Sequence, residues 1–339
     1  MISTLKQIET DCTDPYRNLA AEKLLTLDVR EGECILFLWQ NRHTVVIGRN
    51  QNAWEECSVR QLEADGGHLA RRLSGGGAVY HDLGNLNFSF LVRKADYDPE
   101  KQSDVIRCAA EKLGITARRT GRNDLEAGGR KFSGNAYYET RGRCCHHGTI
   151  MMDVDTEALA RYLTVSGTKL QSKGVASVHS RVINLKELCP DITIDRLKAA
   201  ILGAFGEIYG LPVQPLEADR LCETDLLREA EALSSEGWLF PPRIPFNAAL
   251  EGRYAWGGIR LELYVSGDRI ERAECVSDAM DESLICRIRE ALQGCPYQAE
   301  ELMARVTAAA GEDGDAVTGT ELRIQTGRDI AELIRAQIP

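Results

Sequence analysis

Residues 71–82 of this 339-residue chain read Arg71-Arg72-Leu73-Ser74-Gly75-Gly76-Gly77-Ala78-Val79-Tyr80-His81-Asp82. Strand-like apolar runs at 70–73 and 78–81 flank the glycines. Glycines leave a tight turn without side chains, so backbone N–H groups can approach an anion, while arginine supplies a fixed fork of donors. The segment predicts an anion-binding loop between two strands, with a flexible hairpin and solvated arginines as the alternative. It is neither a P-loop nor a dinucleotide fingerprint, because it lacks Gly-Lys-Ser/Thr and G-x-G-x-x-G.

Strand-like and helical patterns alternate outward from this segment. Residues 34–40 and 44–48 are β-rich and predict an antiparallel pair, and 86–92 and 148–153 predict further strands. Helical periodicity occurs in four segments, of which the first opens with Asp14-Pro15 as N-cap and first helical residue: 15–25, 100–113, 195–209 and 224–235. Hairpin strands with helices between and after them predict an α+β fold with a mixed sheet.

A second domain is predicted at the C-terminal end. Chains beyond roughly 250 residues usually split into domains, and residues 234–245 combine three prolines with small polar residues, as at a boundary that few contacts cross. We expect a catalytic domain at 1–245 and a small α+β accessory domain at 246–339. In the latter, 259–265 and 269–277 predict a hairpin, and helical segments follow from Asp281 and Gln298.

The composition is that of a soluble globular protein, with 43% hydrophobic and 27% charged residues. A net charge of −10 has the wrong sign for holding nucleic acid through its phosphates. The sequence has no signal-peptide pattern and no apolar stretch of membrane-spanning length, so we expect a cytoplasmic protein without membrane association. Eleven cysteines without a C-x-x-C pair indicate reduced thiols.

A second glycine-flanked segment carries the sharpest catalytic candidate. Gly121-Arg122-Asn123-Asp124 precedes residues 128–136, which contain Lys131. A lysine beside a phosphate can stabilise charge that develops during phosphoryl or acyl transfer, although an isolated lysine is more often a solvated surface residue. Asn123 and Asp124 offer oxygen ligands for Mg²⁺ or simply cap a turn.

The run Cys144-Cys145-His146-His147 resembles a metal-binding motif only superficially. Adjacent residues of a strand point to opposite faces, and zinc ligands usually follow C-x₂₋₄-C and H-x₃₋₅-H spacing. We therefore do not expect a metal site there.

In combination these motifs resemble the lipoate–protein ligase A family over nearly the whole chain. The matching segments are 38–41, 44–52, 72–85, 121–124, 129–136, 146–149 and 173–185. The match of the C-terminal part, through 253–257, is weaker, and His179 stands where the family has arginine.

The resemblance implies a fold related to biotin ligases and class II tRNA synthetases, and a two-step reaction. Lipoate, and octanoate as well, would attack the α-phosphate of ATP in the presence of Mg²⁺, giving the acyl-adenylate and pyrophosphate. A lysine amine on an acceptor would then displace AMP. The implied acceptors are the lipoyl domains of 2-oxoacid dehydrogenase complexes and the glycine-cleavage carrier protein. Arg71 or Lys173 would steer an acidic acceptor locally.

The resemblance also assigns the site residues. Lys131 matches the central lysine, which contacts both lipoate and nucleotide and is the catalytic candidate. The nucleotide-binding positions are Arg72, Gly77, Ala78, Val79, Tyr80 and Lys131. The lipoate-binding positions are Lys131, Trp39, Gly48, Arg72, Ser74, His81 and His147. Asn123 and Asp124 are the candidate Mg²⁺ ligands, and residues 169–185 would close over the adenylate. For two of these residues a purely structural role is still an alternative: Trp39 as a core aromatic and His147 as a strand histidine.

Two other classes of function remain as alternatives. An ATP-independent lipoyl or octanoyl acyltransferase of the same superfamily would carry the acyl group on a cysteine thioester. A non-catalytic module that binds nucleotide or lipoyl domains would tolerate loss of Lys131. The presence of Lys131 argues against such a module.

Overall fold

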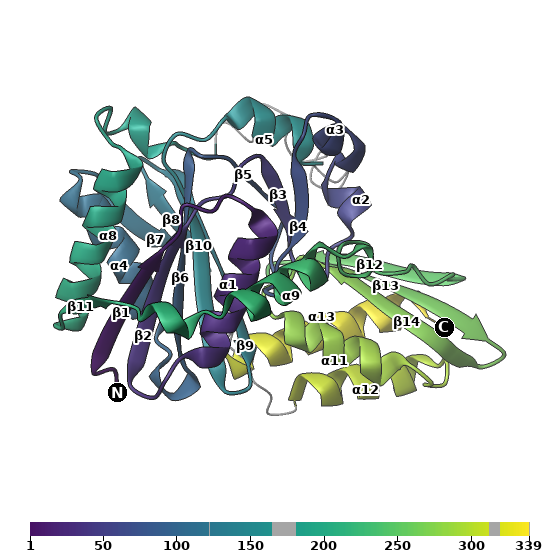
Figure 1. Cartoon of the computed structure of the whole chain (residues 1–339). Helices are drawn as coiled ribbons and strands as arrows, with labels where there is room; N and C mark the ends of the chain where they lie inside the picture. The colour runs from purple at the N-terminus through teal and green to yellow at the C-terminus, as the bar shows by residue number, and fades with distance from the viewer. Residues whose placement is uncertain (122, 165–180, 312–318, 339) are drawn as a thin grey trace. The chain divides into compact units, whose positions relative to one another are not determined.

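The computed structural model describes residues 1–121, 123–164, 181–311 and 319–338 (Figure 1). Its contacts divide the chain into two compact units. The first comprises Met1–Val46, Trp54–Ala70 and Val79–Leu239, and the second comprises Ile47–Ala53, Arg71–Ala78 and Phe240–Pro339. The glycine-rich stretch 71–78 thus packs with the C-terminal residues. A catalytic part up to residue 245 and an accessory part after it stays a prediction.

An eight-stranded mixed sheet forms the centre of the first unit, which confirms the predicted α+β class. Strand β1 runs parallel to its neighbours β2 and β11, and the other neighbouring pairs are antiparallel. In sheet order the strands are β11 (Val213–Pro215), β1 (Thr4–Glu9), β2 (Glu33–Trp39), β6 (Asn85–Arg93), β10 (Arg143–Met151), β9 (Arg130–Thr140), β8 (Asp124–Ala127) and β7 (Ala117–Thr120).

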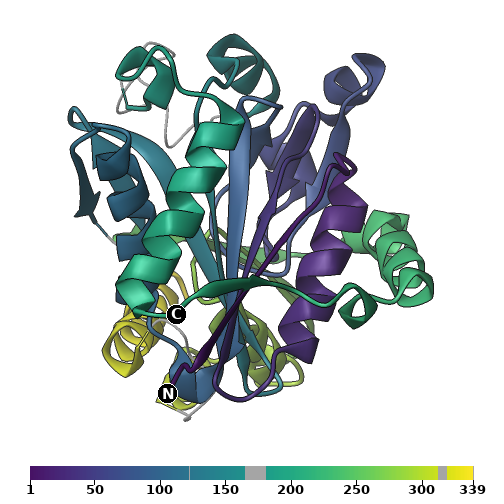
Figure 2. The same ribbon diagram turned by 60° about the vertical axis from the view of Figure 1, so that its left-hand side comes forward.

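Helices cover both faces of this sheet. Helix α1 (Pro15–Asp28) contacts β2, β6 and β10, and α9 (Glu223–Ser234) packs on α1. Helices α4 (Pro99–Lys112) and α8 (Ile194–Tyr209) pack together on the other face, as Figure 2 shows for α1 and α8. Because both faces are covered, every residue of β2 is buried and its sequence is an almost continuous apolar run.

Helix α1 begins as the sequence predicts. The Asp14 carboxylate accepts hydrogen bonds from the backbone N–H groups of Tyr16 (2.8 Å) and Arg17 (3.1 Å), and Pro15 is the first helical residue. Its exposed side makes ion pairs with α9, between Arg17 and Glu223 and between Lys23 and Glu229.

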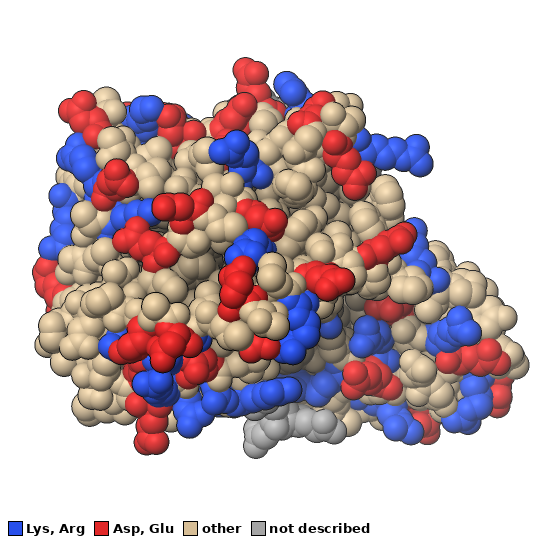
Figure 3. Space-filling model, viewed as in Figure 1, with Lys and Arg blue, Asp and Glu red and all other residues tan. Residues whose placement is uncertain are grey.

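On the face shown in Figure 3, basic side chains generally lie among acidic ones.

The predicted antiparallel pair of residues 34–40 and 44–48 is wrong. Strand β2 pairs with β1 and β6, whereas β3 (Thr44–Ile47) lies between β4 (His68–Arg71) and β5 (Val79–His81) in a separate three-stranded sheet. Between β2 and β3, His43 has a left-handed φ of 44° and the Asn41 side chain bonds inward to α1. The connection therefore redirects the chain and does not close a hairpin.

Several further short elements lie among the described residues before Phe240. They are α2 (Ala53–Glu56), α3 (Val59–Ala64), α5 (Thr156–Tyr162), α10 (Glu236–Leu239) and the 3₁₀ turns Lys94–Asp96, Leu185–Glu187 and Ala218–Arg220. None of the described helices combines the length and apolar character needed to cross a membrane.

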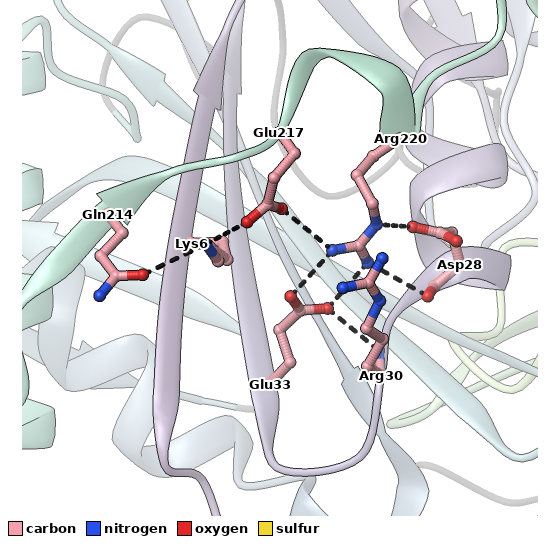
Figure 4. A network of polar contacts seen from close by, with 7 residues as sticks. All are labelled: Lys6, Asp28, Arg30, Glu33, Gln214, Glu217 and Arg220. Atoms are coloured by element: carbon pink, nitrogen blue, oxygen red, sulfur yellow. Dashed lines mark hydrogen bonds and ion pairs between the residues drawn. The ribbon is translucent and has the colours of Figure 1, made fainter.

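An ion-pair network fastens the segment after α8 to the sheet edge (Figure 4). Arg220 donates to Glu33 at 3.0 and 2.9 Å and pairs with Asp28 at the end of α1. Lys6 of β1 pairs with Glu217 at 2.5 Å. Both the Arg220 and Glu33 side chains are about 95% buried, so this pair is part of the interior, whereas the Asp28 and Glu217 side chains are 40% and 46% exposed.

The C-terminal part of the second unit is a small α+β structure, as expected. Its antiparallel strands are β12 (Ala248–Tyr254), β13 (Gly257–Ser266) and β14 (Arg269–Ser277), and its helices are α11 (Glu282–Leu292), α12 (Ala299–Gly311) and α13 (Thr320–Gln337). The predicted β13–β14 hairpin is confirmed, with Gly267 at φ 62° in its turn. Asp281 caps α11 through Leu284 N–H (2.9 Å). Sequence reasoning missed α13.

Candidate active site

A cross-strand row on the first unit's sheet brings several predicted residues onto one face. Trp39 lies opposite Asn87, Asn87 opposite Thr149, Thr149 opposite Gly134, and Gly134 opposite Asp124. Residues in register on neighbouring strands share a face, and strands lie about 4.8 Å apart, so about 14 Å separates β2 from β9. His147 lies two residues before Thr149 and therefore on the same face.

Lys131 reaches this row because Gly134 has no side chain. A Cβ at Gly134 would come within 2.7 Å of the Lys131 Nζ and 2.9 Å of its Cε, so the lysine stem folds over the glycine. The amine lies 2.6 Å from the Asp124 Oδ1, and both side chains are about one-third exposed. The backbone of Lys131 is fixed by two hydrogen bonds, its N–H donating to Arg181 and its carbonyl accepting from Ile183. A cation and a carboxylate therefore lie together at the end of the row formed by β8 and β9.

Asn123 and Asp124 differ in what their polar groups do. The Asn123 side-chain amide donates to the Asn135 carbonyl at 2.9 Å, and its own carbonyl accepts from the Asn135 backbone and side chain. Asp124 pairs with Lys131. Their predicted role as Mg²⁺ ligands stays a proposal.

Trp39 and His147 are linked through Ser89 and Glu22, all of them buried. The Trp39 Nε1–H donates to the Ser89 Oγ at 3.1 Å, and the Ser89 hydroxyl donates to the Glu22 Oε1 at 2.5 Å. The same carboxylate oxygen lies 2.7 Å from the His147 Nδ1. Sequence reasoning missed Glu22. The available signal was a charged residue among the apolar residues on the buried face of α1.

Cys145 joins this cluster, because it lies two residues from His147 and so shares its face. Donor atoms of Glu22, Cys145 and His147 all lie within 4.8 Å of one another. The sequence analysis compared only adjacent residues of the run 144–147, so it missed the i, i+2 pair of Cys145 and His147. Burial, followed by the nearby Glu22 carboxylate, raises the pKa of Cys145 well above its usual value. The thiol is therefore protonated and poorly suited to act as a nucleophile.

His81 belongs to a second polar chain in the first unit. Its Nδ1 lies 3.2 Å from the Asn41 Nδ2, and the Asn41 Oδ1 accepts from the Asn18 Nδ2 at 3.0 Å. The rings of Trp39 and His81 meet edge to face at 6.3 Å. Tyr80 packs instead against the Tyr162 ring at 5.8 Å.

The glycine-rich loop of the second unit is held together by Arg72. Its buried guanidinium donates to the Ser74 Oγ (3.0 Å), to the Gly75 carbonyl (2.6 Å) and to the Gly77 carbonyl (2.8 Å). A methyl group at Gly48 would overlap the Gly76 carbonyl, so that glycine is required by packing alone. At Gly77, by contrast, an added Cβ would meet no described atom within 4 Å.

The expectation that Arg71 steers an acceptor from the surface is wrong. Arg71 is 2% exposed, and its Nη1 donates to the carbonyls of Gly48 (3.2 Å), Arg49 (3.0 Å) and Gln51 (2.6 Å). Burial, with a further contribution from Arg49, lowers its pKa to about 10. Lys173 and most of the loop 169–185 lie outside the described residues, as does His179.

The predicted site residues divide between the two units. The first unit holds Trp39, Val79, Tyr80, His81, Asn123, Asp124, Lys131 and His147, and the second holds Gly48, Arg72, Ser74, Gly77 and Ala78. Within the first unit the sheet register brings Trp39, Asp124, Lys131 and His147 onto one face.

Solved lipoylation proteins are similar to this chain. The Plasmodium falciparum protein LipL1, in complex with lipoate, is 26% identical with a TM-score of 0.79, over 97% of this chain and 99% of that one. A bi-partite lipoate protein ligase from Thermoplasma acidophilum, described with its E2 lipoyl domain, is 27% identical with a TM-score of 0.63, over 72% and 99%. A lipoate-protein ligase A bound with ATP is 26% identical with a TM-score of 0.60, over 70% and 98%.

Family models match both parts of the sequence. Residues 14–206 match the lipoyl protein ligase A/B catalytic domain, and residues 243–314 match the bacterial lipoate protein ligase C-terminus. The catalytic-domain match covers more than half of the chain and includes the whole Trp39–Asp124 row. With the mixed sheet and these motifs in place, the chain belongs to the lipoate–protein ligase family and is a ligase.

Proposed function

We propose that this ligase activates lipoate, and octanoate as well, with ATP and transfers the acyl group to a lysine of an acceptor lipoyl domain. The observation that carries the proposal is the Trp39–Asp124 row, which ends at the ion pair between Lys131 and Asp124. A buried aromatic at one end and a partly exposed cation at the other match the two ends of a medium-chain carboxylate.

The acyl group would lie across the strands. Its carboxylate pairs with Lys131, and its chain extends toward Trp39 over about 14 Å. Burial of about eight carbons at roughly 0.8 kcal/mol each stabilises the bound acid by several kcal/mol. Lys131 aligns the carboxylate with the α-phosphate, although both reactants are anions. A carboxylate oxygen then bonds to the α-phosphorus as pyrophosphate leaves.

The nucleotide would approach the glycine-rich loop at Gly77, where an added Cβ would meet no described atom within 4 Å. Arg72 holds the loop carbonyls, so we assign it the role of fixing the loop shape. Asp124 offers the hard carboxylate oxygen that Mg²⁺ prefers, and Mg²⁺ would neutralise phosphate charge. Asp124 would then pair with Mg²⁺ in place of Lys131, because the Lys131 amine turns to the substrate carboxylate.

In the second step the acceptor amine bonds to the acyl carbon, AMP leaves with the bridging oxygen, and the amine loses a proton. The lipoyl domains of 2-oxoacid dehydrogenase complexes and the glycine-cleavage carrier protein are the proposed acceptors. The Thermoplasma ligase described with its E2 lipoyl domain supports that class. We place the reaction in the cytoplasm.

The ATP-independent acyltransferase remains the competing proposal, and one assay separates the two. The purified chain should exchange pyrophosphate into ATP only when lipoate or octanoate and Mg²⁺ are present, because adenylation is reversible and needs the carboxylate. Mass spectrometry should then detect lipoyl-AMP. Acyl transfer without ATP, with a kinetically competent acyl-cysteine, would establish the acyltransferase instead.

A further inference from the structure

Helix α1 has two buried residues one turn apart. From each of them a chain of hydrogen bonds leads to a different histidine of the proposed site. Asn18 reaches His81 through Asn41, and Glu22 reaches His147 directly. The spacing i, i+4 places Asn18 and Glu22 on the same face of α1. The direction of each hydrogen bond can be followed from groups whose roles are fixed.

The Asn18 chain has only one consistent direction. The Asn18 Nδ2 is surrounded by the carbonyls of Cys12 (3.0 Å) and Gln40 (2.9 Å) and by the Asn41 Oδ1 (3.0 Å). Since backbone carbonyls only accept, this atom must be the amide nitrogen. The Asn41 oxygen is thereby occupied as an acceptor, and its amide nitrogen faces the His81 Nδ1. The Nδ1 must accept, so neutral His81 carries its proton on Nε2.

The Glu22 chain gives the opposite result for His147. Indole N–H is a donor only, so Trp39 makes the Ser89 oxygen an acceptor and turns the Ser89 hydrogen toward the Glu22 Oε1. As a carboxylate, Glu22 can only accept at this oxygen. The His147 Nδ1, 2.7 Å from the same oxygen, must donate. Neutral His147 carries its proton on Nδ1 and keeps Nε2 as its acceptor nitrogen.

We propose that Asn18 with Asn41, and Glu22 with Ser89, are positioning residues that lock His81 and His147 in opposite tautomers. This inference rests on the proposed function for its catalytic meaning. His81 then offers an N–H donor that suits a carboxylate or phosphate oxygen, whereas His147 offers an acceptor that suits an N–H group, such as the attacking amine. A hydrogen on the His81 Nδ1 would face the Asn41 amide N–H.

The tautomers can be read directly by NMR of the full-length chain labelled with ¹⁵N in its histidines, at about pH 8, above the usual histidine pKa. Two-bond ¹H–¹⁵N correlations distinguish the Nδ1–H, Nε2–H and doubly protonated forms. His81→Gln and His147→Gln assign the signals. We expect Nε2–H for His81 and Nδ1–H for His147. The reverse assignment for either ring would overturn the proposal without any reference to activity.

Variants test whether the chains cause the tautomers. Asn41→Asp places an acceptor against the Nδ1 and should move the His81 proton there, and Asn41→Ala should give a mixture. Glu22→Leu should release His147, whereas Glu22→Gln retains an oxygen acceptor and should keep its tautomer. Asn247→Asp, on the exposed side of the second unit, adds the same charge and should change neither spectrum. An unchanged His81 signal in both Asn41 variants contradicts the proposal.

Kinetics separate this inference from the proposed function. Asn41→Asp and Glu22→Leu should lower lipoate-dependent exchange about 10- to 100-fold, the usual cost of losing an orienting partner, while Glu22→Gln stays close to wild type. Switched tautomers with unchanged exchange would remove the positioning role. Wild-type protein without exchange would defeat the proposed function, yet the spectra would still decide the tautomers. One zinc per chain, lost in Glu22→Leu and Cys145→Ser, would also overturn the proposal, because Nδ1 would then be a ligand.

Discussion

Gly134 determines where the amine of Lys131 can lie, since a methyl group there would come 2.7 Å from the Nζ. The contact is with the mobile end of a side chain, so Gly134→Ala should fold normally while it displaces the amine. A misplacement of about 1 Å can cost on the order of 10²-fold in rate. We therefore expect Gly134→Ala to approach the loss in Lys131→Ala, which should reach roughly 10²-fold in both adenylation and transfer.

Pyrophosphate exchange, together with single-turnover transfer from supplied lipoyl-AMP, measures the two steps separately. Lys186→Ala is the matched control, because Lys186 is an exposed lysine paired with Asp153. A Gly134→Ala variant with the wild-type rate would show that the lysine does not need its place over the glycine. Normal transfer in Lys131→Ala would restrict the lysine to adenylation.

Two glycines of the second unit should respond in opposite ways to alanine. Gly48→Ala overlaps the Gly76 carbonyl, a backbone atom that cannot move aside, and should destabilise folding by about 1–3 kcal/mol. Gly77→Ala meets no described atom within 4 Å and should leave stability unchanged while it weakens ATP binding. Urea unfolding and nucleotide titration distinguish these effects. Unaltered ATP affinity in Gly77→Ala would remove Gly77 from the nucleotide site.

At the scale of elements, local signals were sufficient where an element is specified by its own residues. The cap at Asp14-Pro15 predicted the start of α1, and the Gly267 turn predicted the β13–β14 hairpin. Pairing between distant strands was not predictable in this way. Because β2 is apolar from Cys34 to Trp39, this run gives no facing pattern, and nothing local shows that its partners are β1 and β6. The candidate catalytic motifs were found by resemblance, whereas Glu22 joins the candidate site only through tertiary packing.

The Arg220 network should be a large contributor to the stability of the sheet edge. Removing one member of a buried ion pair costs about 3–5 kcal/mol, since the partner charge stays buried. Arg220→Ala leaves Glu33 in that state, whereas Arg17→Ala breaks an exposed pair with Glu223 and should cost less than about 1 kcal/mol. Urea unfolding of both variants at neutral pH measures the difference. Equal losses would contradict the assignment of the Arg220–Glu33 pair to the interior.

The same network predicts a pH dependence. Burial acts to raise the pKa of Glu33, but hydrogen bonds from Arg220 and the Arg30 backbone outweigh it and lower that pKa. A lowered carboxyl pKa gives stability that is present above the unfolded pKa and is lost as pH falls through the folded one. Wild type should therefore lose stability on acidification below about pH 4.5, and Arg220→Ala should lose less over the same interval. Parallel acid profiles would be the contrary result.

At the scale of the whole molecule, the exposed connection around 241–246 has no regular secondary structure and should be the first site of limited proteolysis. The cut fragments should nevertheless stay together. In the second unit, Gly76 N–H donates to the Ala279 carbonyl (3.0 Å) and Ser277 N–H donates to the Asn50 carbonyl (2.9 Å). Size-exclusion chromatography of the nicked protein should give one peak, and separate elution of the C-terminal fragment would argue against this construction of the unit.

The discontinuous second unit also imposes an order on biosynthesis. The Gly76 N–H acceptor, Ala279, leaves the ribosome about 200 residues later. At about 5–20 residues per second, the glycine-rich loop waits roughly 10–40 s for its partner during translation. By residue 215 the nascent chain contains every strand of the first unit's eight-stranded sheet, but it still lacks the C-terminal residues that bond to the loop. Nucleotide-binding competence should therefore be acquired late, when the last third of the chain has emerged, and nascent chains stalled before residue 279 should lack it.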